Sequence, residues 1–297
     1  MRLGAISDEL HDSLEPALAA ATEWGVREIE LNHLDGNVNI AEASDAALAQ
    51  AEVLLRAGRF KICCVSTMAF KTLLLDGVRE HPREAPEYAR HLQSVRRGCE
   101  VARRFGAPYV RIFAFRKSGM VGVGNPSPRL PRGGAIPAEV LKLIVAGLRE
   151  SAEIAEAAGV DLVVENVRSC WGNSCWNTAE ILLAAEHPRL KAVWDPGNDF
   201  VAGGEPYPEG YAALRPWIAH VHAKNAELAD AATGLTRWQR VGQGALDYRV
   251  LLKRLRGDGY AGVVALETHW RGDGLDRLES SRRSFDDLKA CFEAAQA

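Results

Sequence analysis

The stretch EVLKLIVAGLRESAEIAEAAGVDLVVE, residues 139–165, contains a predicted helix followed directly by a predicted strand. Apolar side chains recur at spacings of three and four through residues 139–159, which is typical of a helix with one buried face. Gly159 stands where a left-handed residue commonly ends a helix. The run DLVVE that follows is short and mostly apolar, which indicates a buried strand. This stretch therefore predicts one helix–strand unit.

The same unit recurs along the whole chain. Gly25 and Gly106 end two further helical segments, 14–25 and 89–106, just before the next apolar run. Alternation of strands and helices implies parallel strands joined by right-handed crossovers, and eight units in about 300 residues fit a (β/α)8 TIM barrel. We predict an α/β protein with one such barrel domain over residues 1–297, with a doubly wound open sheet as the alternative. The predicted strands are RLGAI (2–6), EIEL (28–31), KICCVS (61–66), YVRIF (109–113), DLVVE (161–165), KAVW (191–194), IAHVH (218–222) and GVVALE (262–267).

The composition excludes several classes of protein. The formal net charge is -3 and runs of like charge are short, so a chain-wide basic surface for nucleic acid is absent from the sequence. No stretch approaches the roughly 20 apolar residues of a membrane span, and the apolar run at the N-terminus is too short for a signal peptide. The 6 Cys are scattered, which favours reduced thiols over a disulfide framework. We expect a cytoplasmic protein.

Long loops follow the fourth, fifth, sixth and seventh predicted strands. In a barrel, loops at the carboxyl ends of the strands form the face that carries the active site. The loop 115–137 is rich in Gly and Pro, and the sequence allows either a mobile lid or a disordered insertion there. The loops 166–177 and 223–244 contribute polar and Trp residues to the same face.

Four ionisable residues stand at the ends of four successive predicted strands. Glu165, Asp195, His222 and Glu267 each follow or end an apolar run. Unpaired carboxylates are costly to bury and repel one another, so three of them close together call for a cation. Three carboxylates and one imidazole suit a single divalent ion. Mn²⁺ is the expected ion, with Mg²⁺, Co²⁺, Fe²⁺ and Zn²⁺ as alternatives.

Each of these residues also has a structural interpretation. A single Glu at a strand end commonly pairs with a basic side chain, and Asp195 before Pro196 and Gly197 is placed to form a turn. Alternation along a strand puts His220 and His222 on the same face, so the strand pattern does not choose between them. The joint occurrence on four strand ends is what favours a metal site.

These motifs resemble the xylose isomerase-like TIM barrel superfamily, in its sugar phosphate isomerase/epimerase branch. The resemblance covers nearly the whole chain. It implies that Glu165, Asp195, His222 and Glu267 bind one metal ion, that Glu165 and Glu267 are the catalytic acid and base, and that the second His of the family's HxHxK/E motif, His222, is the ligand. The matching stretches are GAISDEL (4–10), ELN (30–32), VVEN, VWDPGN, HVHAKN, VGQGALDY (241–248) and ALETHW.

The chain departs from the usual sugar epimerase pattern at two positions. Asn198 stands where these epimerases often carry a His, and Leu228 where they often carry an Arg. Lys224 and Arg168 are the nearest cationic substitutes, although a solvated loop charge is the alternative for Arg168. The residues expected to bind substrate are Lys224, Asn198, Arg168, His220, Trp238 and His269.

The resemblance implies an isomerase or epimerase of carbohydrate metabolism. The expected reaction on a ketose or keto-sugar removes a proton beside a metal-bound carbonyl and passes through an enediolate. A lyase, decarboxylase or deglycosidase acting on a 3-keto-sugar with the same site is the alternative, and a non-catalytic sugar-binding protein is a third possibility. The expected partner is a small sugar, without nucleic acid or membrane, and a homo-oligomer is compatible with the sequence.

An apurinic-site endonuclease shares this superfamily but requires a cluster of three metal ions rich in His. The predicted strands 3 and 4 end in VST and RIF, so neither offers a His. Thr236, Arg237 and Trp238 occupy the place of that family's Asp-x-His. The remaining ligands suffice for one metal ion, which argues against the nuclease.

Overall fold

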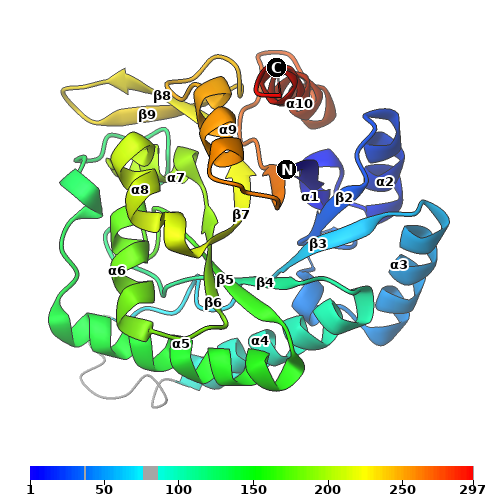
Figure 1. The fold of residues 1–297 in the computed structure, drawn as a ribbon, viewed down its shortest axis with the longest axis horizontal. Coiled ribbons are helices and arrows are strands. Elements are labelled where there is room, and N and C mark those ends of the chain that lie inside the picture. The colour runs from blue at the N-terminus through cyan, green and yellow to red at the C-terminus, as the bar shows by residue number, and fades with distance from the viewer. Residues whose placement is uncertain (37, 76–85, 297) are drawn as a thin grey trace.

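The computed structural model describes residues 1–36, 38–75 and 86–296 and shows a closed barrel of parallel strands (Figure 1). Its strands follow one another around the barrel in the order β1-β10-β7-β6-β5-β4-β3-β2. The predicted (β/α)8 barrel is therefore confirmed. The strands are β1 (Arg2–Ile6), β2 (Glu28–Leu31), β3 (Lys61–Ser66), β4 (Tyr109–Ile112), β5 (Asp161–Glu165), β6 (Leu190–Trp194), β7 (Ile218–Ala223) and β10 (Val263–Leu266).

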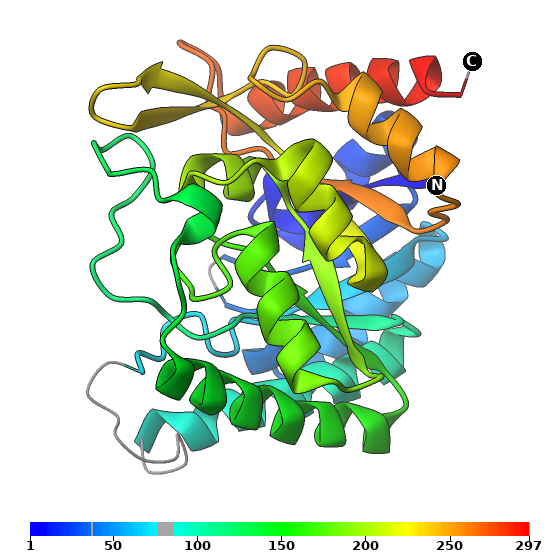
Figure 2. The ribbon, with the colours of Figure 1, turned by 60° about the vertical axis from the view of Figure 1, so that its left-hand side comes forward.

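Helices surround the barrel and cover its outer face (Figures 1 and 2). Side chains of β2 and β10 are buried along their whole length, since these strands have the barrel interior on one side and helices on the other. No helix in the described ranges is both long and apolar enough to cross a membrane. The helices are α1 (Ser7–Leu10), α2 (Leu14–Glu23), α3 (Asp45–Ala57), α4 (Pro86–Phe105), α5 (Ala138–Ala158), α6 (Cys175–Ala185), α7 (Pro196–Ala202), α8 (Tyr211–Leu214), α9 (Tyr248–Gly257) and α10 (Arg277–Ala294), with short helical turns η1 (Ile40–Glu42), η3 (Pro131–Gly133), η4 (Pro206–Gly210) and η5 (Arg215–Trp217).

The helix ends agree with the local sequence signals. Gly25, Gly106 and Gly159 adopt φ values of 75°, 68° and 72°, the left-handed region that the sequence predicts for them. At the start of α6, the Ser174 side chain accepts a hydrogen bond from Asn177 N at 3.1 Å. The three Gly residues end their helices directly before the next strand and so fix where that strand begins.

An antiparallel hairpin, β8 (Asn225–Asp230) and β9 (Leu235–Gln239), extends beyond the barrel after β7. The sequence predicts only a loop at 223–244, and this prediction is wrong, because charged residues interrupt the apolar alternation that marks a strand. The loop 115–137 lies along the hairpin (Figure 2): Gly124 N donates to Thr236 O and Ser127 N to Thr233 O, both at 3.0 Å. These bonds do not fit the alternative of a disordered insertion.

Helix α7 begins immediately after β6, where the sequence predicts a turn at Pro196 and Gly197. The predicted turn is wrong: Pro196 and Gly197 are the first residues of the helix, because Pro is well tolerated at the first helical position. Asp195 caps this helix, accepting a hydrogen bond from Asn198 N at 2.7 Å. The carboxylate is thereby held at the carboxyl end of β6.

Candidate metal centre and active site

The four predicted metal ligands converge at the carboxyl ends of their strands. One atom from each of Glu165, Asp195, His222 and Glu267 lies within 4.8 Å of the others. Ligands of such ions lie roughly 2.0–2.2 Å from the metal, so two ligands of one ion are separated by at most about 4.4 Å. The observed spread is close to that limit, and the four side chains need little movement to hold one ion.

Asp195 combines the two interpretations that the sequence leaves open. Its Oδ1 caps α7, while its Oδ2 faces the centre. The side chain of Asn166 fixes the Asp195 backbone, donating to its carbonyl at 2.7 Å and accepting from its N–H at 2.8 Å. The same residue is thus a helix cap and a candidate metal ligand.

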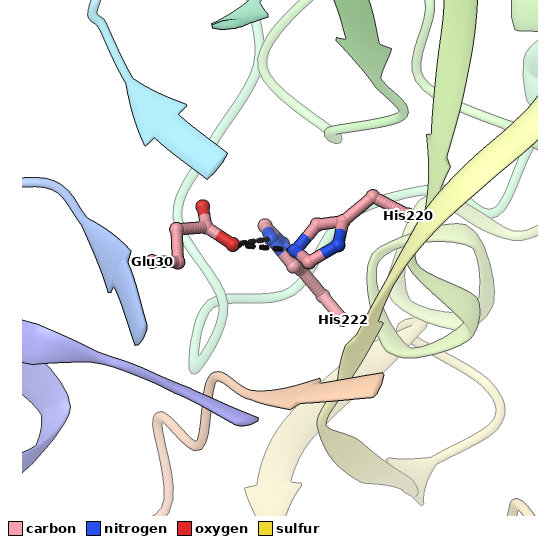
Figure 3. Close-up of side chains that lie close together, drawn as sticks. All are labelled: Glu30, His220 and His222. Atoms are coloured by element: carbon pink, nitrogen blue, oxygen red, sulfur yellow. Dashed lines mark hydrogen bonds and ion pairs between the residues drawn. The ribbon is translucent and has the colours of Figure 1, made fainter. Parts of the chain in front are cut away.

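The two ring nitrogens of His222 point in different directions. Nδ1 faces the centre, 2.9 Å from Glu267 Oε2, 3.8 Å from Glu165 Oε1 and 3.9 Å from Asp195 Oδ2. Nε2 lies 2.9 Å from Glu30 Oε2 (Figure 3). Both ring nitrogens thus face carboxylates, which only accept hydrogen bonds. Burial alone would lower the pKa of His222, but Glu30 and Glu267 outweigh it and raise the pKa well above its usual value. A divalent ion would take the place of the proton on Nδ1, while Glu30 holds the proton on Nε2.

Glu30 is the centre of a buried network on β2 that the sequence prediction missed. Its Oε2 also accepts from His220 Nε2 at 2.7 Å (Figure 3), and its Oε1 accepts from Ser66 Oγ. Burial alone would raise the pKa of Glu30, but His222 and His220 outweigh it and hold the pKa well below its usual value. A Glu in the interior of a buried strand is the signal that could have identified it.

His220 does not join the four-residue set. It lines a cavity of about 360 Å³ whose other walls include Arg2, Lys61 and Tyr109, the first residues of β1, β3 and β4. This cavity is at the amino ends of the strands, on the opposite side from the metal centre. His220 therefore lies away from the metal centre, and the structure does not support the predicted contact between His220 and the substrate.

Arg111, on β4, was also missed. Its Nη1 lies 3.2 Å from Glu165 Oε2 and 3.7 Å from Glu30 Oε1, and the residue is buried. Burial and Glu267 would raise the pKa of Glu165, but Arg111 and His222 outweigh them and lower it. Arg111 therefore favours the ionised form of Glu165 by pairing with Oε2, whereas Oε1 faces His222.

Two of the expected substrate-binding residues, Lys224 and Asn198, contact the proposed ligands directly. Lys224 Nζ is 2.7 Å from Glu267 Oε2, 3.0 Å from Asp195 Oδ2 and 3.3 Å from Asn198 Oδ1. Asn198 in turn donates to Glu165 Oε1 at 2.9 Å. Both residues are thus part of the centre.

The charges fit a cation. The carboxylates of Glu165, Asp195, Glu267 and Glu30 outnumber the ammonium of Lys224 and the guanidinium of Arg111. Burial, with Glu267 and Glu165 nearby, raises the pKa of Asp195 to about 7 even against the opposing effect of Lys224. His222 Nδ1, Asp195 Oδ2 and Glu267 Oε2 are buried without a well-formed hydrogen bond in the described structure. A divalent ion would neutralise the excess charge and coordinate these atoms.

An aromatic and polar rim covers the centre. The Trp238 ring, from β9, lies 5.1 Å from the His269 ring and 5.5 Å from Lys224 Nζ. His269 Nε2 is 3.7 Å from Glu267 Oε1, and its Nδ1 is 3.7 Å from Glu9 Oε1. Burial and the nearby Glu267 raise the pKa of Glu9 to about 8. Arg168 lies further out, in the loop between β5 and α6, buried and without an ion-pair partner in the described ranges.

Known proteins share this architecture. The family model described as xylose isomerase-like TIM barrel matches residues 18–291. None of the curated proteins matches the chain.

Three solved structures are similar over nearly their whole length. A xylose isomerase-like TIM barrel protein from Mycobacterium smegmatis, in complex with magnesium, is 17% identical with a TM-score of 0.72, covering 99% of this chain and 97% of that one. The 3-keto-D-glucoside 4-epimerase of E. coli is 16% identical with a TM-score of 0.69, covering 98% and 100%. A probable 3-DHS dehydratase of Bacillus anthracis is 18% identical with a TM-score of 0.69, covering 98% of each chain. At these identities the similarity establishes a common fold.

Proposed function

Because this chain belongs to the xylose isomerase-like TIM barrel family, we propose that it is a divalent-metal-dependent isomerase or epimerase acting on a ketose or keto-sugar. The observation that carries the proposal is the convergence of Glu165, Asp195, His222 and Glu267 within 4.8 Å. The similarity to the E. coli epimerase supports it at the level of the fold.

The four converging residues are the proposed ligands of one ion, Mn²⁺ first among Mn²⁺, Mg²⁺, Co²⁺, Fe²⁺ and Zn²⁺. When bound, the ion would supply Lewis acidity to a substrate carbonyl and so make the neighbouring C–H more acidic. The oxygen-rich donor set suits Mn²⁺ and Mg²⁺, and the imidazole extends the range to Zn²⁺.

Glu267 and Glu165 are the proposed carriers of the substrate proton. The Glu267 side chain is 13% exposed and borders the rim, whereas that of Glu165 is 2% exposed and is held by Arg111 and Asn198. A carboxylate acts as a base only where it can reach the proton, and the more accessible Glu267 meets that condition. Glu165 would return or accept the proton on a second position of the substrate.

Lys224 and the rim would position the sugar. The Lys224 ammonium, already beside Glu267, can donate to a substrate oxygen on which negative charge develops. Trp238 offers a flat apolar face suited to a sugar ring, and it lies against His269. Together these side chains would limit the access of water to the reacting carbons.

Solvent proton exchange tests the proposal. Mn²⁺-loaded protein is incubated in D₂O with a panel of ketoses, ketose phosphates and 3-keto-glycosides, and products are analysed by mass spectrometry. We expect deuterium on the carbon beside the carbonyl of at least one sugar, abolished in Glu267→Gln. Glu279→Gln, which removes an exposed charge on α10, is the matched control and should be fully active.

The same assay distinguishes the alternatives. Loss of water, carbon dioxide or an aglycone would identify the lyase, decarboxylase or deglycosidase. Retention of the metal without exchange on any sugar would contradict the enzymatic proposal and favour a sugar-binding protein.

A further inference from the structure

Two arginines on loops at the carboxyl-terminal face of the barrel, the buried Arg168 and the half-buried Arg129, have no ion-pair partner in the described ranges. Arg168 is 7% exposed. The Nη1 atom of each arginine is buried without a hydrogen-bond partner in those ranges. The guanidinium carbon of Arg129 lies 4.7 Å from the centroid of the Phe200 ring.

Other buried cations of this protein are paired. Arg111 contacts Glu165 and Lys224 contacts Glu267. Arg168, in contrast, has a second cation as its electrostatic neighbour: burial and then Arg129 lower its pKa. Burying a charge without a counter-charge is costly, and placing two like charges together adds to the cost.

Both arginines belong to loops at the carboxyl ends of the strands, the side of the barrel that carries the metal centre. Arg168 follows the proposed ligand Glu165 by three residues, a separation that spans at most about 10 Å along the chain. Phe200, on which Arg129 stacks, belongs to α7, the helix that Asp195 caps. The two arginines therefore stand on the loops after β4 and β5, on the same side of the barrel as the metal centre.

The backbone around Arg129 is held in place. A Cβ on Gly203 would lie 3.0 Å from Arg129 Cα and 2.8 Å from Leu130 N, so the loop packs directly on the end of α7. Asp199 favours the charge of Arg129 at a distance but forms no ion pair with it in the described structure, and its Oδ1 instead accepts from Cys175 N. The orientation of Arg129 is thus fixed without an acidic partner.

We propose that Arg168 and Arg129 form a subsite for an anionic group, a phosphate monoester or a carboxylate, at the end of the substrate remote from the metal centre. This inference rests on the proposed function for the identity of the substrate as a sugar. Guanidinium groups bind both kinds of anion through paired hydrogen bonds, which supply the acceptors that both side chains lack. The substrate class is then an anionic keto-sugar.

Calorimetric titration with inorganic phosphate, and separately with acetate, tests the subsite. The titrations use metal-free and Mn²⁺-loaded protein, because binding to the metal-free form does not depend on the proposed function. Loss of a charged hydrogen-bond donor weakens binding by about tenfold or more, so Arg168→Gln and Arg129→Gln should each weaken phosphate binding to that extent. Arg96→Gln, an exposed change on α4, is the control and should bind as wild type.

The two anions distinguish the sources of the negative charge. Tighter binding of phosphate indicates a sugar phosphate, and tighter binding of acetate indicates a sugar acid. Removal of one like charge should leave each variant folded, with an unchanged or higher melting temperature without anion and a smaller stabilisation by the preferred anion. Arg168→Lys, which keeps the charge and loses the planar group, provides a second test and should also bind more weakly.

Kinetics complete the test. For a sugar that exchanges deuterium, Arg168→Gln should raise KM for the anionic form and leave kcat nearly unchanged. Equal binding of both anions to wild type and both Gln variants, or no binding to wild type, would overturn the subsite while leaving the metal proposal intact. Phosphate binding in a protein that holds no metal would instead support the subsite and count against the proposed function.

Discussion

Replacing Glu30 by Gln removes the carboxylate that accepts hydrogen bonds from His222 and His220. In the structure, Oε2 of Glu30 accepts from both imidazoles, at 2.9 and 2.7 Å, and Oε1 accepts from Ser66. A Gln side chain has one acceptor oxygen and one NH₂ group, so it cannot accept on both sides. Turned toward the imidazoles, the NH₂ group meets two donors. Turned the other way, it can donate to the Ser66 hydroxyl, but it then faces Arg111 Nη1, a donor 3.7 Å from the position of Oε1.

The consequence depends on the tautomer of His222. If the NH₂ group faces the imidazoles, His222 must move its proton to Nδ1, the atom that faces Glu267 at 2.9 Å and is the proposed ligand. Loss of such a supporting carboxylate reduces metal affinity by about 10- to 100-fold. That range corresponds to about 1.4 to 2.7 kcal/mol. An orientation with the NH₂ group toward His222 reverses the tautomer and gives the upper end of the range, whereas the amide oxygen, a weaker acceptor than a carboxylate, gives the lower end.

Metal affinity is measured by Mn²⁺ titration against a competing chelator at constant pH. Glu28→Gln is the matched control: it lies on the same strand, pairs with Arg2 at 2.8 Å and does not touch His222, so its Mn²⁺ affinity should equal that of wild type. Circular dichroism checks that both variants fold. A folded Glu30→Gln protein with wild-type Mn²⁺ affinity would refute the assignment of Glu30 as the residue that positions His222.

Three further predictions follow from burial, charge and backbone geometry. The pKa of Asp199 is raised from 3.8 to about 6 by burial, so wild-type stability should fall as pH rises through this interval, by up to about 3 kcal/mol. In urea denaturation, Asp199→Asn should accordingly have a higher free energy of unfolding than wild type at pH 8, and this difference should disappear at pH 4. A difference between the two proteins that does not change with pH would contradict this prediction. Lys224→Met removes the ammonium among the carboxylates, so Mn²⁺ should bind more tightly while proton exchange slows by about 100-fold. Weaker Mn²⁺ binding would contradict the excess of negative charge inferred for the metal centre. Gly159→Ala forces a side chain into the left-handed region at φ 72° and should lower the free energy of unfolding by about 1 to 2 kcal/mol, whereas an unchanged value would show that the helix end relaxes.

The barrel and the positions of the proposed ligands could be predicted from local patterns. Repeated strands and helices fix the order of parallel strands, and their carboxyl ends then meet at one face of the barrel. The sequence therefore predicts that Glu165 and Glu267 lie on one face, where the structure brings them together, and it predicts the left-handed end of the helix at Gly159. Each of these inferences needs only residues that are close together in the sequence.

The supporting network could not be predicted in the same way. Glu30 and Arg111 come from strands far apart in the sequence, and burial patterns do not show which charges meet inside a barrel. The turn predicted at Pro196 proved to be the first turn of α7, because Asp-Pro-Gly-Asn suits both structures and the cap made by Asp195 favours the helix. Long-range packing decides the buried network, whereas at Pro196 the local sequence is compatible with both a turn and a helix start.

Anomalous diffraction from crystals soaked in Mn²⁺ tests the central claim most directly, since it locates the ion without reference to a substrate. The structure contains two groups of side chains that could hold a metal in the described ranges, and they share only His222. We predict one strong peak enclosed by Glu165, Asp195, His222 and Glu267. A peak among Glu30, His220 and His222, or no peak at either group, would contradict the account.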